Sequence, residues 1–199
     1  MIESWPSVED LTKFHRMPYA WIESRAKEYD GTAVSHLEIP TIVGKFGISA
    51  SAVGVAGVFF PGFDNFDIAT RMDKYGMAHC TWGKQRAIEA GLDLMGYLLG
   101  EITDLDYPVD LSFVTPFQRD VFTALREVPH GETITYGELA RLAGHPGKSR
   151  AVGSAMHYNP IPILVPCHRV ISAKGELGGW SGPEGWKEWL LELEGWVVE

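Results

Sequence analysis

Residues 135–158 read TYGELARLAGHPGKSRAVGSAMHY, and this stretch decides the fold of the second half of the chain. Thr135 followed three residues later by Glu138 forms a capping box, which predicts a helix over Tyr136–Ala143 that a glycine then ends. A second helix is predicted from Ser149 to Tyr158, after a short turn. Two helices joined in this way are typical of a helix-turn-helix, although a hairpin that only packs has the same periodicity.

The second of these helices has one apolar face and one face of small side chains. Its spacing turns Val152, Ala155 and Met156 toward a core. Small residues let a helix backbone come close to the floor of a DNA groove, but they read little of the base sequence. Weak sequence specificity is therefore expected of the outward face, which consists of Arg150, Ala151, Gly153, Ser154 and His157.

The rest of the chain predicts a mixed α/β (α+β) protein of two domains. Thr115, with Pro116 at the first helical position and Gln118, caps a helix in the second half. In the first half a short helix follows Ser7, and the later elements are two hairpin strands over 41–49 and 51–60, a long helix over 83–102 and an acidic linker over 103–110. We expect a domain with an antiparallel sheet over 1–110, including an N-terminal extension, and a mainly helical domain over 111–199.

Composition and charge restrict the class of protein. The formal net charge is −9, but no Asp or Glu occurs between Leu139 and Gly175, where five Lys and Arg residues lie. A phosphate-binding surface is expected in that segment, because phosphate contacts need basic side chains. The chain has no apolar run of membrane-spanning length and no basic leader, so it is expected to be a cytoplasmic protein, or a nuclear one in a eukaryote, with no membrane partner. Its two cysteines, Cys80 and Cys167, predict neither a disulfide framework nor a metal site.

Cys167 is the candidate nucleophile. An apolar segment follows Asn159 and leads to Cys167, His168 and Arg169. A reactive cysteine needs a base or a positive charge that favours its thiolate, and the two following residues are candidates for these roles. Adjacent side chains on an extended segment point to opposite faces, so a water or a bend is required to connect the thiol to the imidazole.

Several runs in the second half resemble the O6-alkylguanine-DNA alkyltransferases, also called methylated-DNA–protein-cysteine methyltransferases. The resemblance extends from about Thr115 to Gly195. It is carried by VPHG at 128–131, TYGELA at 135–140, RAVGSAM at 150–156, NPIPILVPCHRV at 159–170 and KEWLL at 187–191. It implies a ribonuclease H-like N-terminal domain and a winged helix-turn-helix-like C-terminal domain.

The resemblance implies a role for each residue of the catalytic group. Cys167 is the alkyl acceptor, His168 takes the thiol proton through a water, and Glu194 holds the imidazole in the useful tautomer. Tyr136 helps to rotate the nucleotide and donates a proton to the base. Alkyl transfer to Cys167 is irreversible, so one protein molecule repairs one lesion.

The resemblance also implies how DNA is bound. Arg150 inserts into the duplex where the target base has rotated out, and Ala151, Gly153, Ser154 and Tyr136 lie in the same interface. Asn159 braces the turn that leads to the active site. The substrate pocket is formed by Val165, Val170, Trp180 and Ser181, and Trp180 stands where many members of the family carry Tyr or Phe.

The expected partner is double-stranded DNA that contains O6-alkylguanine, bound by a monomer. No cofactor or metal is expected, because the damaged base itself supplies the transferred group. Two alternatives remain at this point. One is a related binding protein that flips damaged bases without repairing them, although that branch carries Trp at the position of Cys167. The other is a cysteine hydrolase, which would leave the helix-turn-helix without a purpose.

Overall fold

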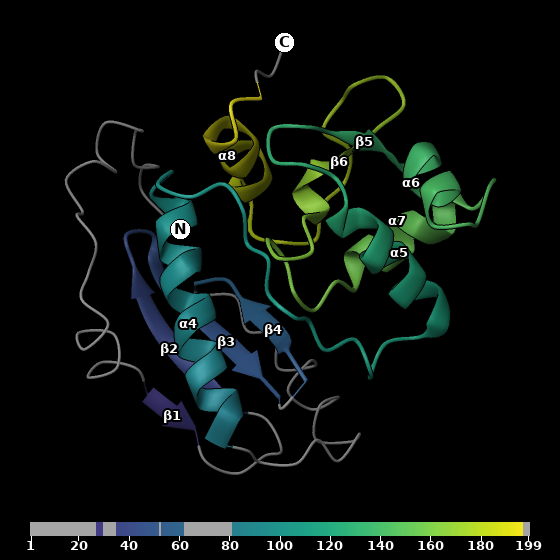
Figure 1. Cartoon of the computed structure of the whole chain (residues 1–199). Helices are drawn as coiled ribbons and strands as arrows, with labels where there is room; N and C mark the ends of the chain where they lie inside the picture. Colours follow the sequence, from purple (N-terminus) through teal and green to yellow (C-terminus); the bar gives the residue numbers. More distant parts are fainter. Residues whose placement is uncertain (1–26, 30–34, 52, 62–80, 197–199) are drawn as a thin grey trace. The chain divides into compact units, whose positions relative to one another are not determined.

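A computed structural model describes residues 27–29, 35–51, 53–61 and 81–196 (Figure 1). Cys80 and the helix predicted after Ser7 lie outside these residues. The chain divides into two compact units, Met1–Phe113 and Val114–Glu199. The protein is therefore a mixed α/β protein with a small antiparallel sheet in the first unit and mostly helices in the second.

The first unit contains a meander of four antiparallel strands in the order β1-β2-β3-β4. These are β1 (Lys27–Tyr29), β2 (Ser35–Thr41), β3 (Gly44–Ala50) and β4 (Val55–Phe59). Helix α4 (Thr81–Leu98) lies along β2 and β3 (Figure 1). The two layers approach closely at Gly91, where an added Cβ would lie 1.8 Å from Cδ1 of Ile39. Apolar side chains of both layers are buried at this contact, and they form the core of the unit.

The strand predicted over 41–49 corresponds to β3 but begins too early, because its first residues form the turn between β2 and β3. The Thr41 hydroxyl accepts from Val43 N at 3.3 Å and donates to Gly44 O at 2.7 Å, which closes the turn. Gly44 has a φ of +117°, a value that favours glycine. The β-branched residues on both sides of the turn concealed it in the sequence. The long helix also ends earlier than predicted, at Leu98.

The sequence predicted an acidic linker over 103–110. In the structure the end of this segment is instead bonded to β4. Val55 N donates to Pro108 O and Asp110 N donates to Val55 O, both at 2.8 Å. The segment therefore adds a parallel bridge to β4. Ser51 Oγ donates to Asp110 Oδ2 at 2.5 Å, and Asp110 is buried, so a polar contact fixes the end of this segment.

The second unit begins with the helices that the sequence predicted. They are α5 (Pro116–Arg126), α6 (Tyr136–Leu142) and α7 (Ser149–His157). The capping boxes of Thr115 with Gln118 and of Thr135 with Glu138 are both present. Each satisfies backbone groups that a helix start otherwise leaves unpaired. The local chemistry of the sequence therefore fixes where α5 and α6 begin.

The remaining elements of this unit carry the candidate nucleophile. A short parallel pair joins β5 (Ile134–Thr135) to β6 (Val170–Ile171), and α8 (Trp186–Leu193) packs against the 3-10 turn η1 (Cys167–Arg169) (Figure 1). Residues 159–171 are all buried. Ile163 has a φ of +73°, an uncommon value for a β-branched residue, so this segment holds a strained backbone next to the site.

Candidate active site

Cys167 begins η1 and is 4% exposed. Its backbone N donates to Val165 O at 2.8 Å. The Asn159 side chain donates to the same oxygen at 2.8 Å and accepts from Ile161 N at 3.0 Å. The amide of Asn159 therefore holds the segment between α7 and the cysteine in a compact loop, which is the bracing position that the resemblance implied.

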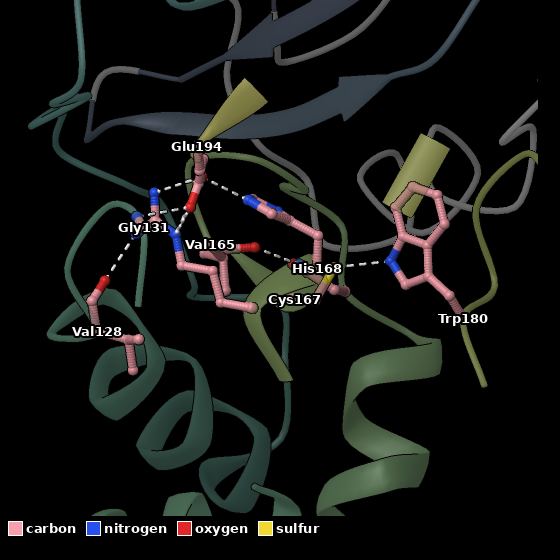
Figure 2. A network of polar contacts seen from close by, with 9 residues as sticks. Val128, Gly131, Val165, Cys167, His168, Trp180 and Glu194 are labelled. Atoms are coloured by element: carbon pink, nitrogen blue, oxygen red, sulfur yellow. Dashed lines mark hydrogen bonds and ion pairs between the residues drawn. The ribbon is translucent and has the colours of Figure 1, made fainter. Parts of the chain in front are cut away.

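His168 and Glu194 form a buried pair behind the cysteine. Nε2 of His168 lies 2.7 Å from Oε1 of Glu194, and both side chains are inaccessible to solvent (Figure 2). Glu194 caps the end of α8, where the sequence alone would place it on the surface. Because Nε2 is committed to the carboxylate, the buried Nδ1 is the ring nitrogen that can exchange a proton. The turn of η1 replaces the extended backbone assumed from the sequence.

Arg169 completes this cluster, where it holds Glu194, whereas the sequence offered it only as a positive charge near the thiol. Its Nε donates to both oxygens of Glu194 at 3.1 and 2.9 Å, and its Nη2 donates to Oε1 at 2.8 Å. Its Nη1 donates to Val128 O at 2.6 Å, while Gly131 N donates to Glu194 Oε2 at 3.0 Å. The carboxylate is thus fixed from three sides (Figure 2). The only signal in the sequence was that Arg169 lies next to the Cys-His pair.

Burial and hydrogen bonding set the charges of this group. Burial raises the pKa of the Cys167 thiol, although hydrogen bonds from Trp180 and Asn159 act in the opposite direction. Burial lowers the pKa of His168. Burial alone would raise the pKa of Glu194, but hydrogen bonds from His168 and Arg169 hold it well below its usual range. At neutral pH the resting site therefore contains a thiol, a neutral imidazole and a carboxylate.

Lys187 is a second buried cation that the sequence did not predict as a site residue. It is 2% exposed, and its Nζ donates to Val170 O at 2.6 Å and to Leu177 O. Burial lowers the pKa of Lys187 to about 8, although the nearby Cys167 acts in the opposite direction. Lys187 joins α8 to the strand and loop that follow the cysteine, and it brings positive charge near the sulfur.

A cavity of about 320 Å³ opens at the cysteine. Ligand pockets span roughly 300–1,000 Å³, so the volume suits a compact group. Cys167, Trp180 and Ser181 line it, in agreement with the predicted positions of the last two. Its other lining residues come from α6, from α7 and from the glycine-rich loop over 178–182: Tyr136, Gly153, Met156, His157 and Gly179.

Two predicted pocket residues, Val165 and Val170, do not line this cavity. Both are fully buried in the core. The Val165 carbonyl accepts from Cys167 N and from Asn159, which uses both of its lone pairs. Val170 N donates to Cys167 O, and the Val170 carbonyl accepts from Lys187. These main-chain groups hold the loop that carries the cysteine.

Helix α7 has the two faces that its sequence indicated. Val152, Ala155 and Met156 are buried, whereas Arg150 and Ser154 are exposed. Ala151 and Gly153 are half-buried on the outward side. Because Gly153, Met156 and His157 also line the cavity, one helix carries both an outward surface and a wall of the candidate active site.

Tyr136 stands at the start of α6 and on the other side of the cavity. Its hydroxyl donates to Gly179 O at 3.1 Å, and its ring lies 3.8 Å from the position of a Cβ built on Gly153. Burial and the nearby Cys167 raise the pKa of Tyr136, so the phenol keeps its proton at neutral pH. The phenol can therefore act as a proton donor into the cavity.

Within residues 27–29, 35–51, 53–61 and 81–196, no group of three or more His, Cys, Asp and Glu side chains could hold a metal ion. None of the helices described is long and apolar enough to cross a membrane.

Comparison with known proteins gives the family. The family described as 6-O-methylguanine DNA methyltransferase, DNA binding domain, matches residues 116–196. A methylated-DNA–protein-cysteine methyltransferase of Methanosarcina acetivorans is 50% identical over 107 residues, which cover 54% of this chain and 68% of the relative. The chain belongs to the methylated-DNA–protein-cysteine methyltransferase family. The resemblance seen in the sequence is therefore confirmed.

Other members of the family match both in sequence and in fold. The methyltransferase of Mycobacterium tuberculosis strain H37Rv is 52% identical over 101 residues, which cover 51% of this chain and 61% of the relative. A crystal structure of Mycobacterium tuberculosis OGT in complex with DNA matches with a TM-score of 0.59 and 34% identity, covering 80% of this chain and 90% of that chain. The O6-methylguanine-DNA methyltransferase of Pyrococcus kodakaraensis strain KOD1 matches with a TM-score of 0.57 and 28% identity, covering 85% and 98%.

Proposed function

We propose that this protein repairs DNA by removing the alkyl group from O6-alkylguanine and keeping it on Cys167. The observation that carries the proposal is a cysteine that lines a cavity of about 320 Å³ and is followed by a buried imidazole on a carboxylate. This arrangement is that of an activated nucleophile. The family, and the relative whose structure holds DNA, support damaged duplex DNA as the partner.

The reaction is a displacement at the alkyl carbon. His168 accepts the thiol proton through a water, and Glu194 stabilises the imidazolium that forms. The sulfur then attacks the alkyl carbon, so that a carbon–sulfur bond forms while the carbon–oxygen bond to guanine breaks. Guanine leaves with the electron pair, and a proton from Tyr136 neutralises the ring. Tyr136 recovers its proton through solvent from His168, which balances the charges.

The product explains why each molecule acts once. A thioether has no low-energy return to a thiol, because dealkylation would require displacement of a thiolate, which is a poor leaving group from an unactivated alkyl carbon. The protein is therefore consumed in stoichiometric amounts. No cofactor takes part in this scheme, because the lesion supplies the group that is transferred.

The base reaches the cavity by rotating out of the duplex. A base inside the stack cannot reach a buried sulfur, and extrusion costs a few kcal/mol. The outward face of α7 lies against DNA through Ala151, Gly153 and Ser154, and the exposed Arg150 fills the space that the base leaves. Because α7 also forms a wall of the cavity, the helix that contacts the groove stands next to the place where the base is received.

The proposal also assigns a fold type to each of the two units. The meander covered by α4 corresponds to a ribonuclease H-like domain, and α5, α6 and α7 with the β5-β6 pair correspond to a winged helix-turn-helix. We expect a monomer that acts on chromosomal DNA in the cytoplasm, or in the nucleus of a eukaryote. A damage-binding protein without transfer, or a cysteine hydrolase, would not need both the outward face of α7 and this thiol.

Counting lesions repaired per protein molecule tests the proposal. A duplex with labelled O6-methylguanine is mixed with increasing amounts of protein, and guanine that has lost the label is measured at completion. We expect the amount repaired to equal the amount of active protein and to stop there. Repeated turnover would favour a hydrolase, and tight binding without loss of label would favour a damage-binding protein.

A further inference from the structure

Trp180 makes a polar contact with the nucleophile itself. Its indole Nε1 donates to Cys167 Sγ at 3.4 Å, and Figure 2 shows the ring on the sulfur side of the cysteine. Trp180 also lines the cavity together with Cys167. An N–H donor at a sulfur stabilises a thiolate more than a thiol, because hydrogen bonds to charged groups are the stronger ones.

The loop around Trp180 holds the indole in this place. Tyr136 donates to Gly179 O just before it, and Ser181 Oγ donates to His157 O just after it, both at 3.1 Å. An added Cβ at Gly182 would lie 2.6 Å from the indole ring, so a residue with a side chain there would displace the ring. The loop is therefore built to seat a large aromatic ring beside the sulfur.

Charged and titratable groups face the sulfur from the other elements as well. Tyr136 of α6 and His157 of α7 line the cavity with Cys167, and the charge of Lys187 from α8 acts on the sulfur. His168 and Arg169 of η1 are bonded to Glu194 instead. The ammonium of Lys187 is bonded to two backbone carbonyls. Lys187 therefore acts on the sulfur from a distance, whereas the indole N–H acts by direct contact.

We propose that Trp180 is a positioning residue for alkyl transfer, which holds Sγ toward the cavity and supports the negative charge on sulfur as the proton leaves. This role rests on the proposed function. A thioether is uncharged and accepts hydrogen bonds weakly, so the contact loses its strength once Cys167 carries the alkyl group. Trp180 thus favours the reactive form of the cysteine over the spent form.

The test is the pH dependence of Cys167 reactivity in Trp180→Phe, which keeps an aromatic ring but lacks the N–H. Iodoacetamide labels the thiolate, and the rate is measured on the Cys167 peptide by mass spectrometry over a range of pH. The pH at which the labelling rate is half-maximal is expected to rise by about one unit in this variant. A hydrogen bond to a charged group stabilises it by about 1.5 kcal/mol or more, which corresponds to about one pH unit. Trp180→Leu is expected to shift the midpoint in the same direction. An unchanged midpoint in both variants would overturn the proposal.

Glu184→Gln is the control, because it changes an exposed side chain just after the same loop and keeps both the indole N–H and the contacts that hold it. Its midpoint is expected to stay at that of the parent protein. A shift as large as that of Trp180→Phe would mean that the loop, and not the N–H, controls the sulfur. Methyl transfer from a damaged duplex is measured on the same proteins. If the parent protein accepts methyl and Trp180→Phe has the same labelling midpoint as the parent, the role of Trp180 is refuted but the proposed function stands. If the parent protein accepts no methyl, the proposed function itself is refuted.

Discussion

The guanidinium of Arg169 and the carboxylate of Glu194 form a buried, two-pronged ion pair at the end of α8. Nε and Nη2 of the arginine both reach the carboxylate, at distances from 2.8 to 3.1 Å. The residues are 8% and 6% exposed. Because His168 bonds to the same carboxylate, the pair that stabilises the fold also orients the imidazole behind the nucleophile.

Glu194→Gln is expected to destabilise the protein by about 3 kcal/mol, since breaking a buried ion pair leaves the guanidinium without its counter-charge. Urea unfolding measures this loss. Glu192→Gln, an exposed position on the same helix, is the matched control and is expected to change the stability by less than about 0.5 kcal/mol. Equal stabilities of the two variants would contradict the structural role of Glu194.

Acidification from pH 7.5 to 5.5 is expected to remove about 1 kcal/mol of stability through His168. Burial lowers the pKa of His168 in the folded state, so the folded protein leaves it neutral while the unfolded chain binds a proton below about pH 6.5. The stability that this histidine contributes is thus present above that pH and lost as the pH falls. Urea unfolding of the protein and of His168→Gln at both pH values measures the difference, and parallel losses in the two proteins would contradict it.

Further acidification weakens the protein through Glu194, whose folded pKa is held well below its usual range. Because the pKa of Glu194 is lower in the folded than in the unfolded protein, the stability that this carboxylate contributes is complete above about pH 4.3. It is lost as the pH falls below that value. Glu194→Gln is expected to lack this second loss. If its unfolding free energy fell as steeply below that pH as that of the parent, other carboxylates would be responsible.

Asn159→Ala is expected to cost about 2 kcal/mol, because Ile161 N and the loop carbonyl of Val165 each lose a buried partner. The reactive loop should loosen at the same time. The measurements are urea unfolding and the labelling rate of Cys167 at neutral pH. Stability and labelling that both match the parent would show that the side chain does not brace this loop.

Arg150→Ala is expected to slow repair in duplex DNA by about tenfold or more, because extrusion of the base costs a few kcal/mol that the inserted side chain helps to offset. Reaction with a free O6-alkylguanine base needs no extrusion and should change little. Rates of both reactions, measured side by side with Arg150→Lys, check this. Equal losses on duplex and free base would refute the insertion role.

The sequence predicted those features that depend on local chemistry. The caps at Thr115 and Thr135 and the buried face of α7 follow from neighbouring residues, and the structure confirms them. The β2-β3 turn at Gly44 was missed because β-branched residues continue on both sides of it.

Buried charges were the second kind of feature that local reasoning missed. Arginine and lysine are mostly exposed in proteins, but Arg169 and Lys187 are buried here by contacts with segments distant in the sequence. Glu194 is similar, since its partners lie 25 and 26 residues earlier in the chain. Its role came from the resemblance to the family and not from its position on a charged helix.

If Cys167 itself accepts the alkyl group, the mass of the peptide that contains it changes as lesions are repaired. The protein is incubated with a duplex that contains O6-methylguanine and is then digested. We predict that the Cys167 peptide gains one methyl group in place of the thiol hydrogen, in proportion to the lesions lost, and that Cys167→Ala repairs none. Loss of lesions with an unmodified Cys167 peptide would show that Cys167 is not the acceptor.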